Sequence, residues 1–131
     1  LLAAAAVILR NRRRSPPLPA PEWAARELKA LEQNLAADRI TTAVFAERLA
    51  DVLRTYVERR FGLPATRQTT AELLATAGPD LPADAVRTVL DRCDLAKFAG
   101  RVPDRDESKE LLVRSREALV VQGRTPERGE Q

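Results

Sequence analysis

Apolar side chains recur along most of the chain at every third or fourth position, which is the spacing of one face of an α-helix. The clearest of these stripes lies in residues 42–61, and we expect this segment to form the central helix. Its apolar members are Phe45, Leu49, Val52, Leu53 and Tyr56. Weaker stripes predict further helices over residues 22–38, 70–77, 82–100 and 104–121.

The ends of these helices are marked by residues with known capping behaviour. Gly62 stands where a left-handed residue follows a helix, and Pro64 prevents that helix from continuing. Thr69 and Glu72 have the spacing of a capping box, in which both side chains accept hydrogen bonds from free backbone N–H groups. Asp104, with an acidic residue three positions later, is expected to cap the last helix.

These elements predict an all-α fold, a single compact bundle of about five helices, one of them short, over residues 22–121. Aromatic residues make up only 4% of the chain, and strand-forming residues are few. The apolar period stops at the end of the bundle, so residues 122–131 are expected to form a disordered tail. The side chains expected to be mostly buried are Leu49, Leu53, Tyr56, Val86, Leu90, Cys93 and Leu112.

The chain opens with an unbroken apolar run over residues 1–9, which an Arg cluster follows at once. Because there is no Met, we expect a piece of a longer protein whose missing part lies N-terminal. We interpret residues 1–14 as the end of a transmembrane helix with its flank, and residues 15–21, with four prolines, as a stiff linker. Arg clusters beside a span stay in the cytoplasm, which predicts a single-pass inner-membrane protein with the helical domain in the cytoplasm. The alternative is an apolar helix that belongs to the soluble fold.

The net positive charge of the chain comes from its N-terminal end. The formal net charge is +3, yet residues 1–14 alone carry four arginines and residues 15–121 have a small negative net charge. A helix-turn-helix DNA-binding domain is an alternative, because the helices over 70–77 and 82–100 have suitable lengths. Between residues 80 and 97, however, carboxylates outnumber cations, which disfavours contact with a phosphate backbone and predicts no nucleic-acid partner.

Side chains suited to catalysis are scarce. The chain has no His, and its one cysteine, Cys93, falls on an apolar stripe where a buried structural thiol is expected rather than a nucleophile. The five glycines stand apart, so no phosphate-binding loop is predicted. The carboxylates of Asp104, Asp106 and Glu107 lack the spacing of a calcium loop and are better explained as helix caps. We therefore predict no catalytic residues, metal or cofactor, while an enzyme of unknown type stays a further alternative.

Two groups of residues are candidates for contact with a partner protein. The first is basic and lies at the end of the helix over 42–61, where cations also have a structural role beside the helix C-terminus. The second lies at the end of the helix over 82–100, where the large apolar residue Phe98 is expected in the core, although an aromatic side chain there can also anchor a partner. The candidate residues are Arg59, Arg60, Arg67, Asp94, Lys97 and Phe98.

The segments 53–74 (LRTYVERRFGLPATRQTTAELL), 90–104 (LDRCDLAKFAGRVPD) and 111–121 carry a resemblance to known proteins. They resemble the cytoplasmic C-terminal tails of bacterial single-span membrane proteins associated with Bat aerotolerance proteins, MoxR-type AAA ATPases and von Willebrand A-domain proteins. The resemblance covers roughly residues 45–121 and implies a helical cytoplasmic module without catalytic residues. A protein partner is expected, for which the ATPase and the A-domain protein are candidates alongside a protein of neither class. The expected function is a membrane-tethered protein-interaction module.

Overall fold

In the computed structural model, which describes residues 18–129, the chain forms helices joined by loops and no strand within that range. A short 3-10 turn, η1 (Ala65–Arg67), precedes α4. The helices are α2 (Ala20–Ala36), α3 (Thr42–Phe61), α4 (Thr70–Thr76), α5 (Ala83–Ala99) and α6 (Arg105–Gly129). The predicted all-α fold with one short helix is thereby confirmed for this part of the chain.

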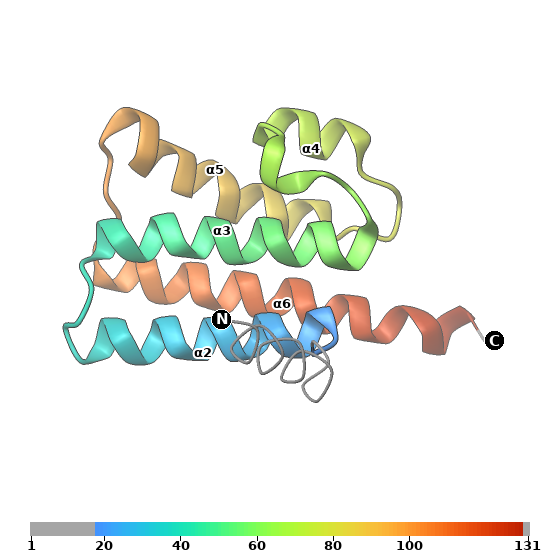
Figure 1. The fold of residues 1–131 in the computed structure, drawn as a ribbon, viewed down its shortest axis with the longest axis horizontal. Coiled ribbons are helices and arrows are strands. Elements are labelled where there is room, and N and C mark those ends of the chain that lie inside the picture. Colours follow the sequence, from blue (N-terminus) through green and yellow to red (C-terminus); the bar gives the residue numbers. More distant parts are fainter. Residues whose placement is uncertain (1–17, 130–131) are drawn as a thin grey trace, which may run out of the picture.

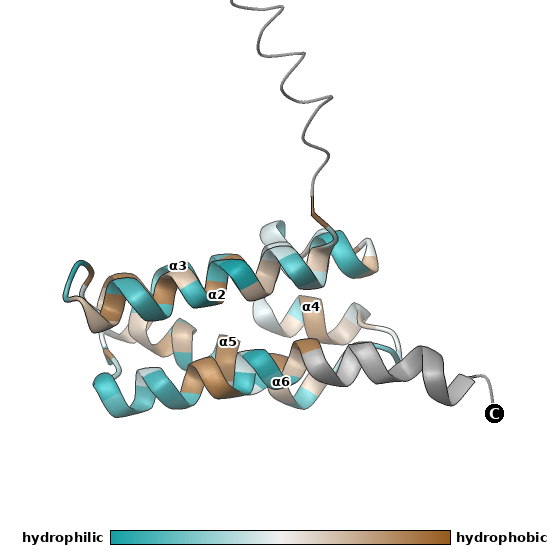
Figure 2. Ribbon diagram, turned by 90° about the horizontal axis from the view of Figure 1, so that it is seen from below, coloured by the Kyte–Doolittle hydropathy of each residue, from teal (hydrophilic) through white to brown (hydrophobic). Residues whose placement is uncertain are grey.

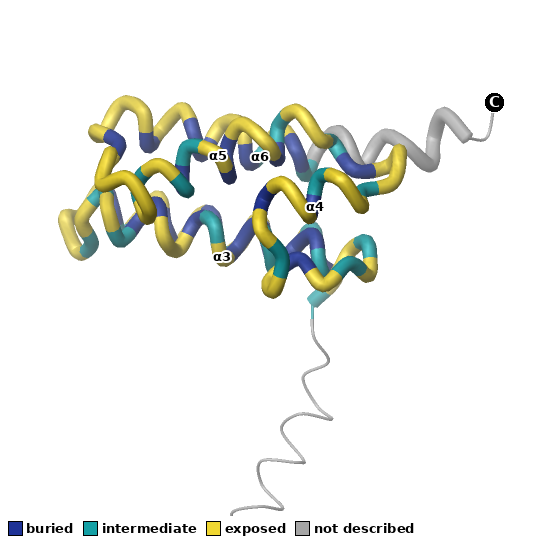
Figure 3. The backbone as a smooth tube through the Cα atoms, turned by 90° about the horizontal axis from the view of Figure 1, so that it is seen from above, coloured by how far each residue is buried: buried dark blue, intermediate teal, exposed yellow. Residues whose placement is uncertain are grey.

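The long helices α2, α3, α5 and α6 pack side by side as a bundle, and the short α4 packs on α5, above the C-terminal half of α3 in the view of Figure 1. Helix α3 contacts α2, α5, α6 and η1, so the prediction that it is the central helix is confirmed. Figure 2 shows that apolar and polar positions alternate along the helices, as expected of elements with one buried face. Burial follows the same pattern, with exposed positions on the outer side of each helix (Figure 3).

The core is made by the apolar stripes that the sequence predicts. Tyr56 and Leu49 of α3 and Leu90 of α5 have no exposed surface, and Leu53 is 2% exposed. Every side chain expected to be mostly buried is buried, which confirms the predicted helix faces. Those side chains are Leu49, Leu53, Tyr56, Val86, Leu90, Cys93 and Leu112.

The capping predictions are also confirmed. Gly62 adopts a left-handed conformation with φ 73°, and its N–H group donates to the carbonyl of Glu58 at 3.0 Å. In the capping box before α4, the N–H of Glu72 donates to the Thr69 hydroxyl at 3.1 Å and the N–H of Thr69 donates to the Glu72 carboxylate at 2.9 Å. The Asp104 carboxylate accepts from the backbone of Glu107 at 2.8 Å and caps α6.

Replacing Gly62 with Val should destabilise the domain by at least about 1–2 kcal/mol, because a residue with a Cβ atom is strained in the left-handed conformation. A Cβ at this position would meet no atom within 4 Å, so the cost comes from the backbone alone. Gly78→Val is the matched control, since Gly78 is equally open and has no positive φ. Urea unfolding of both variants should show a clear loss of stability for Gly62→Val only. Equal losses of stability would mean that the left-handed conformation at position 62 does not strain a residue with a Cβ atom.

The predicted start of the first helix is wrong, and its end lies two residues before the predicted one. Helix α2 begins at Ala20, inside the segment assigned to the linker, because Pro21 is accommodated in a first turn, where its missing N–H is not needed. It ends at Ala36 rather than Asp38, since Asp38 has a left-handed conformation with φ 57° that a helix cannot contain. The guanidinium of Arg105 donates to the carbonyl of Leu35 and to the Asp38 carboxylate, which ties this turn to α6.

The predicted tail over residues 122–131 also needs correction, because α6 continues to Gly129. A helix that is already nucleated adds further residues at little cost, so α6 can continue past the end of its apolar stripe in the sequence. The predicted end of a transmembrane helix, residues 1–14, and residues 15–17 of the linker lie outside the described residues. Among residues 18–129, every helix is too short or too polar to cross a membrane.

Candidate protein-binding site

A groove of about 380 Å³ lies between α3, the segment that leads into α4, and the C-terminal half of α5. Four of the predicted partner-binding residues line it, although they come from two distant segments of the sequence. Arg67 lies on the side of η1, and Asp94, Lys97 and Phe98 belong to α5. The fold thus brings one residue of the basic group, Arg67, and the end of α5 to one surface.

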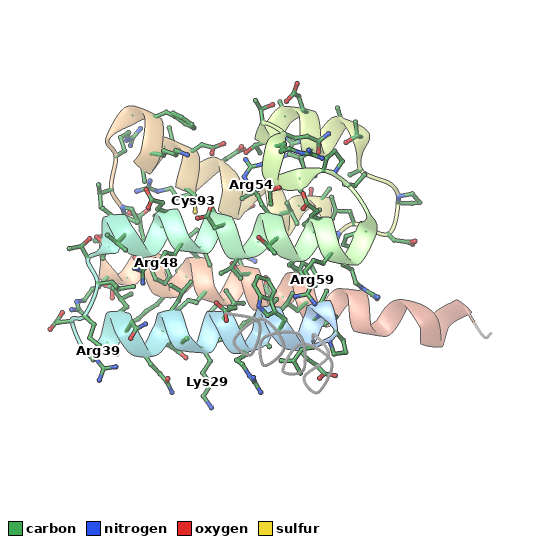
Figure 4. All side chains as sticks on the ribbon, viewed as in Figure 1. Lys29, Arg39, Arg48, Arg54, Arg59 and Cys93 are labelled. Carbon is green, nitrogen blue, oxygen red and sulfur yellow. The ribbon has the colours of Figure 1, made fainter. Side chains whose placement is uncertain are left out.

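Arg54 fixes one wall of this groove. Its half-buried guanidinium donates to the backbone carbonyls of Ala65 at 3.0 Å and Gln68 at 2.6 Å, and to the hydroxyl of Thr70 at 2.8 Å. Figure 4 shows this side chain reaching from α3 toward the segment before α4. Because one rigid, permanently charged group bonds three points of the connection, Arg54 holds η1 and the start of α4 against α3.

Asp94 joins the same network from α5. The hydroxyl of Thr70, which is 6% exposed, donates to the Asp94 carboxylate at 2.6 Å. A continuous chain of hydrogen bonds therefore runs from α3 through the first residue of α4 to α5. Asp94 is a predicted partner-binding residue, and within this chain it has a structural role in positioning the groove wall.

Phe98 lies at the rim of the groove, and its side chain is 76% exposed. The expectation that Phe98 belongs to the core is therefore wrong. Five positions separate it from the buried Cys93, which is a rotation of about 140° around the helix axis and turns the ring away from the bundle. The ammonium group of Lys97 lies 5.3 Å from the centre of the Phe98 ring, within range of a cation–π contact.

Arg59 and Arg60 lie away from the lining of the groove. The guanidinium of Arg59 lies 5.2 Å from the centre of the Trp23 ring of α2 and donates to the carbonyl of Leu18 at 2.5 Å. Figure 4 places Arg59 beside the start of α2, so this arginine fastens the entry of the chain to the bundle. Arg60 is exposed at the end of α3. Burial raises the pKa of the Tyr56 phenol, and the charge of Arg60 offsets only part of this rise.

Cys93 lines the groove but is itself buried, as predicted. Burial, with the charge of Asp94 as the next cause, raises the pKa of the thiol to about 12. At neutral pH the sulfur is therefore protonated, and it lacks the thiolate character that nucleophilic cysteines need. The thiol packs with the core between α3 and α5, which fits the structural role expected from its position on an apolar stripe.

The acidic start of α6 is engaged in capping and pairing. The two carboxylate oxygens of Glu107 accept hydrogen bonds from Arg92 at 2.9 and 3.0 Å, and this bond lowers the pKa of Glu107. Arg92 also donates to the carbonyl of Arg101 at 2.6 Å, so it clamps the loop between α5 and α6. Within the described ranges, the acidic and thiol side chains form no group suited to a metal ion.

The sequence did not point to Arg54, although that residue organises the groove. Its position beside the stripe residue Leu53 is no distinguishing signal, because Arg48 lies beside the stripe residue Leu49 in the same helix and is exposed. The residues that it bonds are backbone carbonyls in a loop, which leave no pattern in the sequence. Comparisons of the chain with protein-family models, curated proteins and solved structures find no match.

Proposed function

We propose that the helical domain is a protein-interaction module that a transmembrane helix ending in residues 1–14 tethers to the inner membrane. In this proposal the domain lies in the cytoplasm and has no catalytic activity. The observation that carries it is the exposed Phe98 ring at the rim of a groove with a fixed wall. Exposed aromatic side chains beside a formed depression are typical anchors of protein interfaces.

The charges around the ring define the partner surface that would fit. Lys97 and Arg67 are exposed cations on opposite sides of the groove, whereas Asp94 is occupied by Thr70. A partner segment with an apolar pocket for Phe98 and a carboxylate within reach of Lys97 or Arg67 would satisfy this surface. Because the network around Arg54 already holds the wall in place, little ordering would oppose binding.

Two partner classes follow from the resemblance of residues 45–121 to tails of bacterial single-span membrane proteins. They are a MoxR-type AAA ATPase and a von Willebrand A-domain protein. Both are proteins, which agrees with a surface that combines an aromatic anchor with charges of both signs. The membrane tether would keep the groove close to partners that are themselves at the cytoplasmic face.

The test is to measure the affinity of the 131-residue chain for the purified MoxR-type ATPase and A-domain protein of the same bacterium. We expect one of them to bind, and Phe98→Ala to weaken that binding by about 30-fold, the typical effect of an interface hot spot. Val113→Ala is the matched control, because Val113 is an exposed apolar residue of α6 outside the groove.

Thermal unfolding should be nearly the same for both variants, since neither side chain is buried. Binding of both proteins that is unaffected by Phe98→Ala would rule out the groove as the docking site. If neither protein binds the wild-type chain, these two partner classes are ruled out.

A further inference from the structure

A second surface runs along the seam between α5 and α6, on the outer side of the bundle. Two hollows of about 660 and 470 Å³ lie along this seam and share Thr88 in their lining. On α5, the residues Asp84, Thr88, Asp91 and Leu95 follow one another at spacings of three or four and so form one stripe. Leu95 is 40% exposed at the end of the stripe.

The seam has an excess of negative charge after its internal ion pairs are taken into account. Arg92 is paired with Glu107, and Arg114 is paired with Glu117. Asp84, Asp91 and Glu110 also line the hollows, and they have no cationic partner within 4.0 Å among the described side chains. The surface therefore offers three carboxylates without a salt bridge next to an exposed leucine.

We propose that this seam binds a basic amphipathic helix of a partner protein. A groove between two helices accepts the side-chain ridge of a third helix, and Leu95 supplies an apolar contact at one end. From Asp84 to Leu95 the stripe is about 17 Å long, which matches about three turns of the incoming helix. Lysine or arginine residues at heptad spacing on that helix would face Asp84 and Asp91, which are themselves seven residues apart.

The charge of the seam selects this occupant over others. An anionic lipid surface or a nucleic acid would be repelled by the same carboxylates. The seam is also distinct from the Phe98 groove, because the two share no lining residue. Binding at the seam does not depend on the function proposed for that groove.

The experiment uses the 131-residue chain and a fluorescein-labelled 14-residue peptide with leucines on one helical face and lysines elsewhere. Fluorescence anisotropy at low salt should show binding, and a peptide with Glu in place of Lys should not bind. Asp91→Asn combined with Glu110→Gln should weaken binding of the Lys peptide about tenfold, and Leu95→Ser should weaken it by a similar factor. The matched control is Glu22→Gln with Asp106→Asn, which removes the same charge from exposed positions outside the seam and should leave the affinity unchanged.

Equal losses in the seam variant and the control would overturn the proposal, because only net charge would then matter. Tighter peptide binding after replacement of Arg10, Arg12, Arg13 and Arg14 by alanine would also overturn it, since the chain's own arginines would be the occupant. Self-association of the chain that Leu95→Ser abolishes would identify a second copy as the occupant instead. Loss of binding confined to the seam variants, with unchanged circular dichroism spectra, supports the proposal.

Discussion

Leu53→Ala should lower the free energy of unfolding by about 2–5 kcal/mol. Leu53 is 2% exposed and lies on α3, the helix that contacts α2, α5, α6 and η1. Removing its isobutyl group loses the hydrophobic transfer energy of the deleted carbons and leaves a cavity that packed helices can fill only in part. The measurement is urea unfolding followed by circular dichroism, with the slope compared between variant and wild type.

Leu95→Ala is the matched control for this experiment, because the same atoms are deleted from a side chain that is 40% exposed on α5. Its cost should be well below half of that at Leu53, since less apolar surface is returned to water and no enclosed cavity forms. If Leu53→Ala leaves the unfolding midpoint unchanged, the assignment of α3 as the central helix of the core is contradicted.

Arg54→Met should lower the free energy of unfolding by about 2–4 kcal/mol, although replacing an arginine on a helix surface usually changes stability little. The substitution keeps most of the aliphatic stem but leaves the carbonyls of Ala65 and Gln68 without their guanidinium donor. The loss should be local as well as global. Hydrogen exchange of the backbone amides in α4 should accelerate more than exchange in α2, because α4 contacts little beyond α5 once the Arg54 link is removed.

Arg48→Met is the control for Arg54, since Arg48 lies on the same helix, its side chain is exposed, and it forms no salt bridge with the described side chains. It should change stability by less than about 0.5 kcal/mol. Arg54→Lys should rescue little, because a single ammonium group cannot reach three acceptors with the geometry of a guanidinium. Full stability of Arg54→Lys would show that charge alone, and not the forked donor geometry, holds the groove wall.

The parts of the fold that were predictable are those governed by local physical rules. The apolar stripe of α3 predicts its buried face, because the helical period alone decides which residues point inward. Gly62 and the pair Thr69–Glu72 predict helix ends, because their conformations and hydrogen bonds involve neighbours within a few residues. Each of these predictions requires no knowledge of how the helices pack.

The candidate site was predictable only in part, because it depends on packing between distant segments. Arg67 and Lys97 are recognisable as exposed charges, but only the meeting of η1 and α5 brings them to one groove. The exposure of Phe98 follows from its angular position around the axis of α5 relative to Cys93. The expectation that Phe98 is buried came only from the size of its apolar side chain. Arg54 acts through backbone carbonyls, which every residue possesses and which no sequence pattern distinguishes.

The most direct test of the central claim is photocrosslinking from position 98 of the protein in its native cells. Phe98 is replaced with p-benzoylphenylalanine in living cells, and Val113 is replaced in the same way as the control outside the groove. The proposed docking site predicts a light-dependent covalent adduct with one protein from position 98 and none from position 113. No adduct at position 98, or the same adduct at both positions, would contradict the assignment of the groove as a protein-binding site.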